Sequence, residues 1–256
     1  MAAPENRFKS ALKRGDVLYG CWAGFADPYA TEVLSTAGFD WLVLDAEHAP
    51  NDLRSLMHQL QVLQGRESQP VVRLPMGEAW LIKQVLDAGA QTLLIPMVES
   101  AAQVAALVRA MRYPPDGIRG AGAALARASQ FSSIPDYTRS ANDQMCLLVQ
   151  VETRAGIAAL DDILKVEGVD GVFIGPSDLA ADMGYPGAKA EPPVQAVIRD
   201  ALARIAASDK AAGILATDHD TALSYREQGA HFLAVGIDVL MLADTARATM
   251  RRWRDG

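Results

Sequence analysis

Short apolar runs recur along the chain and alternate with longer amphipathic stretches. Several of the runs are apolar almost throughout, as in WLVL, TLLIP and GVFIG. Runs of this kind are typical of strands that are buried on both faces, as in a parallel sheet. The eight predicted strands are Val17–Trp22, Trp41–Asp45, Pro70–Leu74, Thr92–Pro96, Met145–Val151, Gly171–Ile174, Ala212–Ala216 and Phe232–Gly236.

The stretches between these runs have the spacing of amphipathic helices. Several end in glycine, which favours the left-handed backbone that terminates a helix. A further helix, Arg7–Arg14, precedes the first strand. The other predicted helices are Tyr29–Ala37, Asp52–Gln64, Leu81–Ala88, Ala101–Met111, Ile157–Lys165, Val194–Ser208, Asp220–Gln228 and Val239–Trp253.

Eight strand-then-helix units over 256 residues predict an α/β fold, a TIM (β/α)8 barrel with an extra N-terminal helix, as a single domain over residues 1–256. A doubly wound open sheet is the alternative. Such a sheet more often carries a dinucleotide fingerprint after its first strand, and CWAGFADP has no GxGxxG.

One connection is much longer than the rest. More than thirty residues separate the helix ending near Met111 from the strand at Met145. Long loops in compact domains are usually functional or mobile. We expect a short helix at Asp136–Asn142 to return the chain to the barrel; the alternative is that Gly117–Gly122 folds over the site.

Composition limits the classes of function. The formal net charge is −7 and the pI is near 5.1, so the chain lacks the basic surface of a non-specific nucleic-acid binder. It has neither a secretory signal pattern nor an apolar run long enough to span a membrane. Cys21 and Cys146 lie in apolar runs and are interpreted as core residues of a cytoplasmic protein.

Polar side chains gather where the predicted strands end. Because the carboxyl ends of barrel strands form one face, where active sites lie, we expect these side chains to share a site. Taken singly, Ser177 and Asp178 could cap a helix, Glu152 could pair with Arg154, and Asp45 could form a turn. The residues at the strand ends are Asp45, Glu47 and His48, then Arg73, then Gln150 and Glu152, then Ser177 and Asp178.

This set of side chains suits a hard divalent cation and an anionic substrate. Carboxylates favour Mg²⁺ or Mn²⁺, whereas zinc would recruit more histidines than His48. Arg73 could bind a carboxylate and stabilise an enolate. No lysine follows a strand, which argues against Schiff-base chemistry. The remaining histidines, His58, His219 and His231, are interpreted as structural or solvated, with a place at the rim of the site as the alternative for His219.

Four segments, FDWLVLDAEHAP, QPVVRLP, LVQVETR and GVDGVFIGPSDLAADMG, resemble the class II pyruvate aldolases of the hydroxy-keto-acid aldolase family, within the citrate-lyase β-subunit superfamily. The resemblance extends over essentially the whole chain. Two stretches, RYPPDGIRGAGAALARAS and IPDYTRSANDQM, look most like the 4-hydroxy-2-oxoheptane-1,7-dioate aldolases. The opening GCWAGFADPYATEVL looks more like the 2-dehydro-3-deoxyglucarate aldolases.

The resemblance implies a divalent metal ion (Mg²⁺, Mn²⁺ or Co²⁺) and no organic cofactor. By this resemblance, Glu152 and Asp178 would bind the metal, and His48 would be the general base. Arg73 would stabilise the enolate, and Gln150 with Ser177–Asp178 would bind pyruvate. Asp45 and Glu47 would orient the metal's water, and Trp22 would line the pocket.

Asp87 matches the family acid that pairs with the catalytic histidine. It falls near the end of a predicted helix, far from His48 in one chain, so we expect it to act from a neighbouring subunit. A solvated helix-end acid is the alternative. One departure is Ala46, where the family commonly has glycine; a methyl group there could strain the backbone or crowd the metal's water.

The implied reaction is reversible retro-aldol cleavage of a 4-hydroxy-2-oxo acid to pyruvate and an aldehyde. If the aldehyde is succinate semialdehyde, Arg119 or Arg127 could bind its distal carboxylate. The alternatives are a sugar-acid aldolase releasing tartronate semialdehyde, a phosphoenolpyruvate or acyl-CoA lyase, and an inactive keto-acid-binding protein. The resemblance also implies a homohexamer with Val239–Trp253 exchanged between subunits.

Overall fold

The computed structural model describes residues 2–254, and its centre is a closed barrel of parallel strands. Each strand pairs with the next in the sequence, and β8 pairs with β1. The predicted TIM barrel is thereby confirmed. Its strands are β1 (Leu18–Ala23), β2 (Trp41–Asp45), β3 (Gln69–Arg73), β4 (Thr92–Ile95), β5 (Cys146–Val151), β6 (Gly171–Ile174), β7 (Ala211–Leu215) and β8 (Ala230–Ile237).

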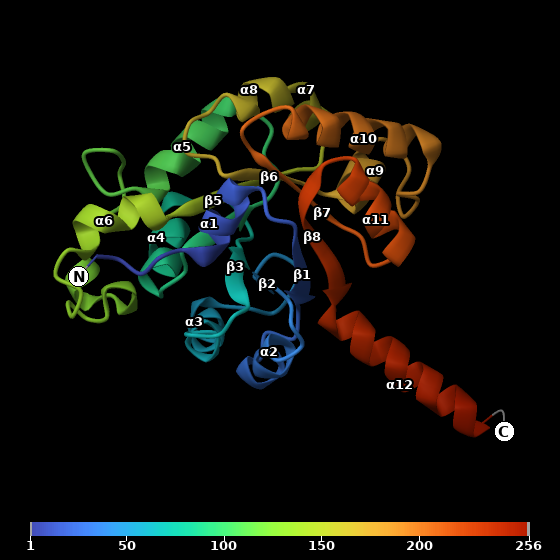
Figure 1. Ribbon diagram of the computed structural model, residues 1–256, viewed down its shortest axis with the longest axis horizontal. Helices are drawn as coiled ribbons and strands as arrows, with labels where there is room; N and C mark the ends of the chain where they lie inside the picture. Colours follow the sequence, from blue (N-terminus) through green and yellow to red (C-terminus); the bar gives the residue numbers. More distant parts are fainter. Residues whose placement is uncertain (1, 255–256) are drawn as a thin grey trace.

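Helices surround the barrel (Figure 1). Two differences from the prediction concern short segments: one predicted helix is split into α7 and α8 at Ala159, and α9 follows β6 directly. The helices are α1 (Arg7–Arg14), α2 (Pro28–Ser35), α3 (Leu53–Val62), α4 (Ala79–Asp87), α5 (Ala101–Met111), α6 (Tyr137–Gln144), α7 (Arg154–Ala158), α8 (Leu160–Leu164), α9 (Pro176–Asp182), α10 (Pro192–Ala206), α11 (His219–Glu227) and α12 (Asp238–Arg254).

The extra helix α1 closes the N-terminal end of the barrel. The Phe8 ring lies 5.8 Å from the Trp41 ring and 6.0 Å from the Phe232 ring, centroid to centroid. Gly20 and Gly213 leave room for Trp41 and Phe232, because an added Cβ would come within 2.3 Å of either ring. Packed aromatic side chains therefore fill this end, and the opposite end remains for a site.

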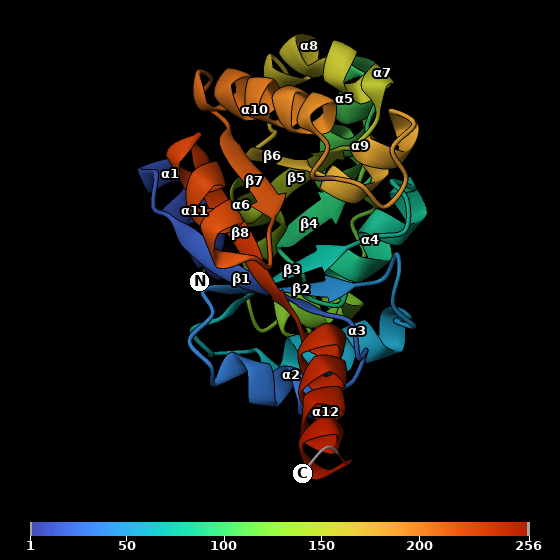
Figure 2. The same cartoon turned by 90° about the vertical axis from the view of Figure 1, so that its right-hand side faces the viewer.

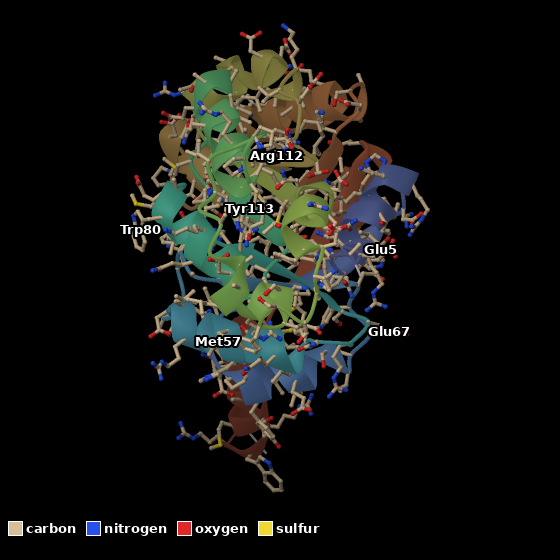
Figure 3. The ribbon with its side chains drawn as sticks, turned by 90° about the vertical axis from the view of Figure 1, so that its left-hand side faces the viewer. Glu5, Met57, Glu67, Trp80, Arg112 and Tyr113 are labelled. Carbon is tan, nitrogen blue, oxygen red and sulfur yellow. The ribbon has the colours of Figure 1, made fainter. Side chains whose placement is uncertain are left out.

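The long connection between α5 and β5 lies along the flank of the barrel. It contains two 3-10 turns, η1 (Ala123–Leu125) and η2 (Arg127–Ser129), and then α6, which confirms the predicted return helix. Figure 3 looks onto this flank, with Tyr113 near the centre of the view. The Ile118 N–H donates to the Arg109 carbonyl at 2.8 Å. The alternative, in which Gly117–Gly122 covers the site, is therefore wrong.

Helix α12 projects away from the barrel (Figures 1 and 2). It begins directly after β8 and carries exposed apolar side chains along its length. Among residues 2–254, no helix combines the length and the apolar character needed to cross a membrane. The exposed apolar residues of α12 are Leu240, Met241, Leu242, Met250 and Trp253.

Candidate active site

A cavity of about 380 Å³ opens at the carboxyl ends of the strands. Its wall includes the predicted residues Trp22, Asp45, His48 and Arg73, which come from three neighbouring strands or the turns after them. The predicted residues Gln150, Ser177 and Asp178 also line it. The fold thus brings most of the predicted site into one cavity.

Arg73 is held by two carboxylates. Its Nε and Nη2 donate to the two oxygens of Asp45 at 2.9 and 2.7 Å, and its Nη1 lies 2.7 Å from Glu47 Oε2. Burial favours a raised pKa for Asp45, but the hydrogen bonds and charge of Arg73 outweigh it and lower that pKa. Asp45 therefore stays ionised and fixes the guanidinium in the cavity wall.

Asp45 also shapes the turn that carries His48. Its Oδ1 accepts from the backbone N–H groups of Glu47 at 3.0 Å and His48 at 3.4 Å. The His48 ring is 66% exposed, and its Nε2 lies 3.8 Å from Glu47 Oε1. Ala46 has no positive φ, so its backbone needs no glycine. The strain expected from this departure is absent.

Glu152 is almost fully buried and is hydrogen-bonded to Gln150, a residue of the cavity wall. Its Oε1 accepts from the Met97 N–H at 2.9 Å, and its Oε2 accepts from Gln150 Nε2. Burial, reinforced by the charges of Asp178 and Glu47, raises the pKa of Glu152 to about 7. The nearby charges that act on this carboxyl group are therefore those of other acids, and within residues 2–254 no Lys, Arg or His forms an ion pair with it.

Gly175 allows Glu152 to approach the start of α9. A Cβ at Gly175 would lie 2.3 Å from Glu152 Oε2. Pro176 begins α9, and Asp178 stands in its first turn at the cavity wall. The charges of Glu152 and Asp178 repel each other, so the pair fits a divalent cation, which would neutralise both.

Within residues 2–254, no group of three or more His, Cys, Asp or Glu side chains is arranged to hold a metal ion. A pair of carboxylates is nevertheless enough for Mg²⁺, which usually keeps water or substrate oxygens as its other ligands. The Oε1 atom of Gln150 is buried and has no hydrogen-bond partner in this part of the chain. It is a further polar atom beside the two acids.

Trp22 packs against the guanidinium group of Arg73. The Arg73 guanidinium carbon lies 5.1 Å from the centroid of the indole ring, and the Phe173 ring lies 5.5 Å from it on centroids. The indole is therefore a fixed part of the wall. The guanidinium of Arg73 is held through its nitrogens by the two carboxylates and by a cation–π contact with the Trp22 ring.

Asp238 joins the root of α12 to the cavity. Its carboxylate is buried and accepts from the N–H groups of Gly24 at 2.8 Å and Phe25 at 3.2 Å. Gly24 and Val239 both line the cavity. The loop after β1 and the start of α12 are thus tied together at the mouth of the site.

Asp87 does not meet His48 within the chain. It ends α4, and its Oδ1 accepts from Arg119 Nη2 at 2.7 Å. Arg119 is fully buried, and Arg127 donates to the Ala88 carbonyl at 3.0 Å. Neither arginine lines the cavity, because both pack beside the end of α4 opposite the site. The expectation that one of them binds a distal carboxylate is wrong within a single chain.

Sequence reasoning missed the backbone of Met97. This residue has a φ of 54° and directs its N–H at Glu152. No sequence pattern marks a left-handed methionine. Phe173, also missed, follows from strand periodicity, because inward positions at the end of a strand face the site.

The comparisons with known proteins cover the whole barrel. The family model "HpcH/HpaI aldolase/citrate lyase" matches residues 18–245. The chain is 73% identical over 99% of both sequences to a hydroxypyruvate/pyruvate aldolase of Roseovarius nubinhibens. It is 53% identical to a 4-hydroxy-2-oxo-heptane-1,7-dioate aldolase of Escherichia coli, over 97% of this chain and 95% of that one.

A solved structure agrees with these matches. The crystal structure of an HpcH/HpaI aldolase/citrate lyase family protein from Burkholderia cenocepacia superposes with a TM-score of 0.93 at 39% identity, over 97% of this chain and 99% of that one. The family match, the identities and the shared barrel all agree. The chain belongs to the HpcH/HpaI aldolase/citrate lyase family.

Proposed function

We propose that this protein is a divalent-metal-dependent aldolase that cleaves a 4-hydroxy-2-oxo acid reversibly into a 2-oxo acid and an aldehyde. The observation that carries the proposal is that Arg73 and Asp178 line one cavity, while the buried carboxylate of Glu152 is bonded to Gln150 of the same wall and feels the charge of Asp178. A divalent ion held by the two carboxylates would supply Lewis acidity toward the oxygens of the 2-oxo acid.

Side chains of the protein transfer the proton, stabilise the enolate and bind the 2-oxo acid. In the cleavage direction, His48 takes the proton of the C4 hydroxyl group, the C3–C4 bond breaks, and the aldehyde leaves. The bonding electrons pass into an enolate, which Arg73 stabilises through its charge. Gln150 and the start of α9 hold the 2-oxo acid, while Trp22 excludes water from one wall. Protonation at C3 then completes the reaction.

The identity of the 2-oxo acid and the aldehyde is argued from the cavity and the relatives. The basic side chains that line the cavity are Arg73 and His48. A single chain therefore offers no second guanidinium for the far carboxylate of succinate semialdehyde. With the 73% identical hydroxypyruvate/pyruvate aldolase, this favours pyruvate or hydroxypyruvate as the nucleophile and a small, uncharged aldehyde as its partner.

The second candidate substrate is 4-hydroxy-2-oxoheptane-1,7-dioate, with succinate semialdehyde as the aldehyde. It is favoured by the 53% identity to an aldolase of that name. It requires a cation from a neighbouring subunit. Comparing both aldehydes at equal concentration with pyruvate separates the two candidates.

We further propose that the protein works as a homo-oligomer, a hexamer by family resemblance, in which α12 packs on a neighbouring subunit. The exposed apolar side chains of α12 support this. In such an assembly Asp87 of one subunit would approach His48 of another and orient its ring. This arrangement accounts for an acid that has no role in the cavity of its own chain.

Proton exchange at C3 of pyruvate in D₂O, followed by NMR, tests enolate formation without knowledge of the aldehyde. We expect exchange with Mg²⁺, Mn²⁺ or Co²⁺ that falls about 100-fold or more in Arg73→Ala. Arg54→Ala, an exposed arginine on α3, is the matched control. Absence of exchange with every metal, in folded protein that binds pyruvate, would overturn the proposed function.

A further inference from the structure

A second cavity lies beside the amino ends of β3 and β4, apart from the aromatic side chains of Phe8, Trp41 and Phe232 that close the barrel. It has a volume of about 450 Å³, within the range of small-molecule sites. Four segments far apart in the sequence form its walls: residues 4–7, 60–70, 89–91 and 127–137. Gln69, the first residue of β3, and Gln91, which directly precedes β4, are among its lining residues. The proposed reaction uses none of these residues.

Arg127 lines this cavity as a partly buried cation that forms no ion pair with an acid of residues 2–254. Its Nη1 donates to the Ala88 carbonyl at 3.0 Å, and its Nη2 donates to Gln64 Oε1 at 2.7 Å. Gly89 permits this position, since a Cβ there would lie 2.4 Å from Nη1. Neutral partners fix the guanidinium but leave its charge uncompensated, and burial lowers its pKa.

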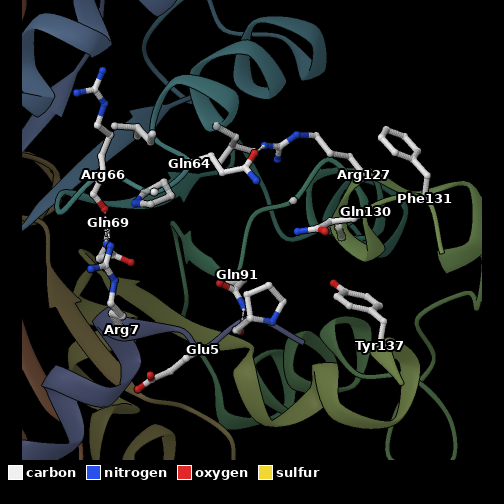
Figure 4. A pocket seen from close by; sticks show the side chains of 17 residues that line it. Glu5, Arg7, Gln64, Arg66, Gln69, Gln91, Arg127, Gln130, Phe131 and Tyr137 are labelled. Atoms are coloured by element: carbon white, nitrogen blue, oxygen red, sulfur yellow. Dashed lines mark hydrogen bonds between the residues drawn. The ribbon is translucent and has the colours of Figure 1, made fainter. Parts of the chain in front are cut away.

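A second cation faces the cavity from the opposite side. Figure 4 shows Arg7 and Arg127 on opposite sides of the pocket. Arg7 donates to the backbone carbonyl of Arg66, and within residues 2–254 neither Arg7 nor Arg127 has an ion-paired carboxylate. The acid at the rim is Glu5, which accepts from the Ser10 hydroxyl group at 2.8 Å.

The rim on the Arg127 side is conformationally strained. Gln130, Phe131 and Ser132 have φ values of 51°, 56° and 68°, a left-handed run without glycine. The Ser129 hydroxyl group helps to hold it by accepting from the Ser132 N–H at 3.0 Å. Backbone strain of this kind persists where the surrounding structure maintains it, often at ligand sites. Gln130 and Phe131 both line the cavity.

We propose that this cavity binds a small organic dicarboxylate, with one carboxylate on Arg127 and the other toward Arg7. Arginine suits carboxylates because its planar fork donates two parallel hydrogen bonds. The amide groups of Gln91 and Gln130 add neutral donors, and Leu60, Leu63 and Phe131 contact the carbon chain. The site is separate from the catalytic cavity, so ligand binding there is independent of Arg73.

Titration calorimetry of the full-length protein with glutarate tests the proposal, and inorganic phosphate serves as a compact dianion for comparison. We expect glutarate to bind more tightly than phosphate, and its affinity to fall at least 10-fold in Arg127→Gln. The matched control is Arg139→Gln, an arginine that is 88% exposed on α6. Arg73→Ala should retain glutarate binding, because it alters only the catalytic cavity.

Arg7→Gln provides a second variant on the opposite wall, in case Arg127→Gln does not fold. A 10-fold or greater loss there also supports the site. The proposal is overturned if wild-type protein binds no glutarate at millimolar concentration, if both arginine variants bind it normally, or if Arg73→Ala abolishes binding. Phosphate binding as tightly as glutarate would overturn the assignment to a dicarboxylate.

Discussion

Met97 holds its backbone in the left-handed region directly beside the proposed metal ligands. A non-glycine residue is uncommon there, and the conformation costs about 1 kcal/mol or more. In return, the Met97 N–H points at Glu152 Oε1. One residue therefore stores strain and fixes the orientation of a buried carboxylate.

We expect Met97→Gly to keep the affinity for Mn²⁺, because glycine adopts positive φ freely and retains the N–H. Met97→Pro removes the N–H and fixes φ near −65°, so Mn²⁺ affinity should fall about 10- to 100-fold, as when a partner of a metal ligand is lost. Calorimetric titration with Mn²⁺ measures both. Equal affinities in the two variants would show that the hydrogen bond does not position Glu152.

The residue scale is also where sequence reasoning was least complete. The charged residues at the strand ends were predicted, because strand ends in a barrel share one face. The pairing of Arg73 with both Asp45 and Glu47 was not, since it depends on side-chain conformations that spacing does not encode. The same holds for the φ of Met97, which is set by tertiary contacts.

At the scale of elements, the periodicity of apolar residues was sufficient to predict the barrel. Runs such as Trp41–Asp45 are buried on both faces, as strands are in barrels and in doubly wound sheets, and the count of eight strand-then-helix units favoured the barrel. Short segments were harder. α7 and α8 together span about three turns, too few for a pattern to distinguish one helix from two.

The turn between β6 and α9 is the element that brings the two proposed ligands together. In Gly175→Ala the new methyl group would collide with Glu152, and we expect the carboxylate to move and Mn²⁺ affinity to fall at least 10-fold. Gly122→Ala is the control, because no atom lies within 4 Å of a Cβ at Gly122. Unchanged Mn²⁺ affinity in Gly175→Ala would argue against Glu152 as a ligand.

At the scale of the whole molecule, the direction of α12 does not follow from the barrel fold. The helix was predicted from its pattern, but its direction could not be, since a helix that covers its own barrel and one that covers another chain have the same periodicity. Its exposed apolar residues, with Trp253 at 82% exposure, form the kind of surface that marks a protein–protein contact.

If α12 packs on a neighbouring subunit, charges on its apolar residues should weaken assembly. We expect the double variant Leu240→Glu, Leu242→Glu to lower the mass measured by sedimentation equilibrium at micromolar concentration. The double variant Thr245→Glu, Thr249→Glu places the same two charges at exposed polar positions of the same helix and should leave the mass unchanged. An unaltered mass in the double variant would exclude α12 as the assembly contact.

Asp238 gives this helix an influence on the site. Its carboxylate binds the N–H groups of Gly24 and Phe25, so the root of α12 and the wall of the cavity move as one unit. If α12 packs on a neighbouring subunit, that subunit and a ligand of the cavity act on the same junction. Thermodynamic linkage makes their effects reciprocal: the factor by which assembly tightens substrate binding equals the factor by which substrate tightens assembly. The concentration of the protein would thereby act as an effector of its own active site.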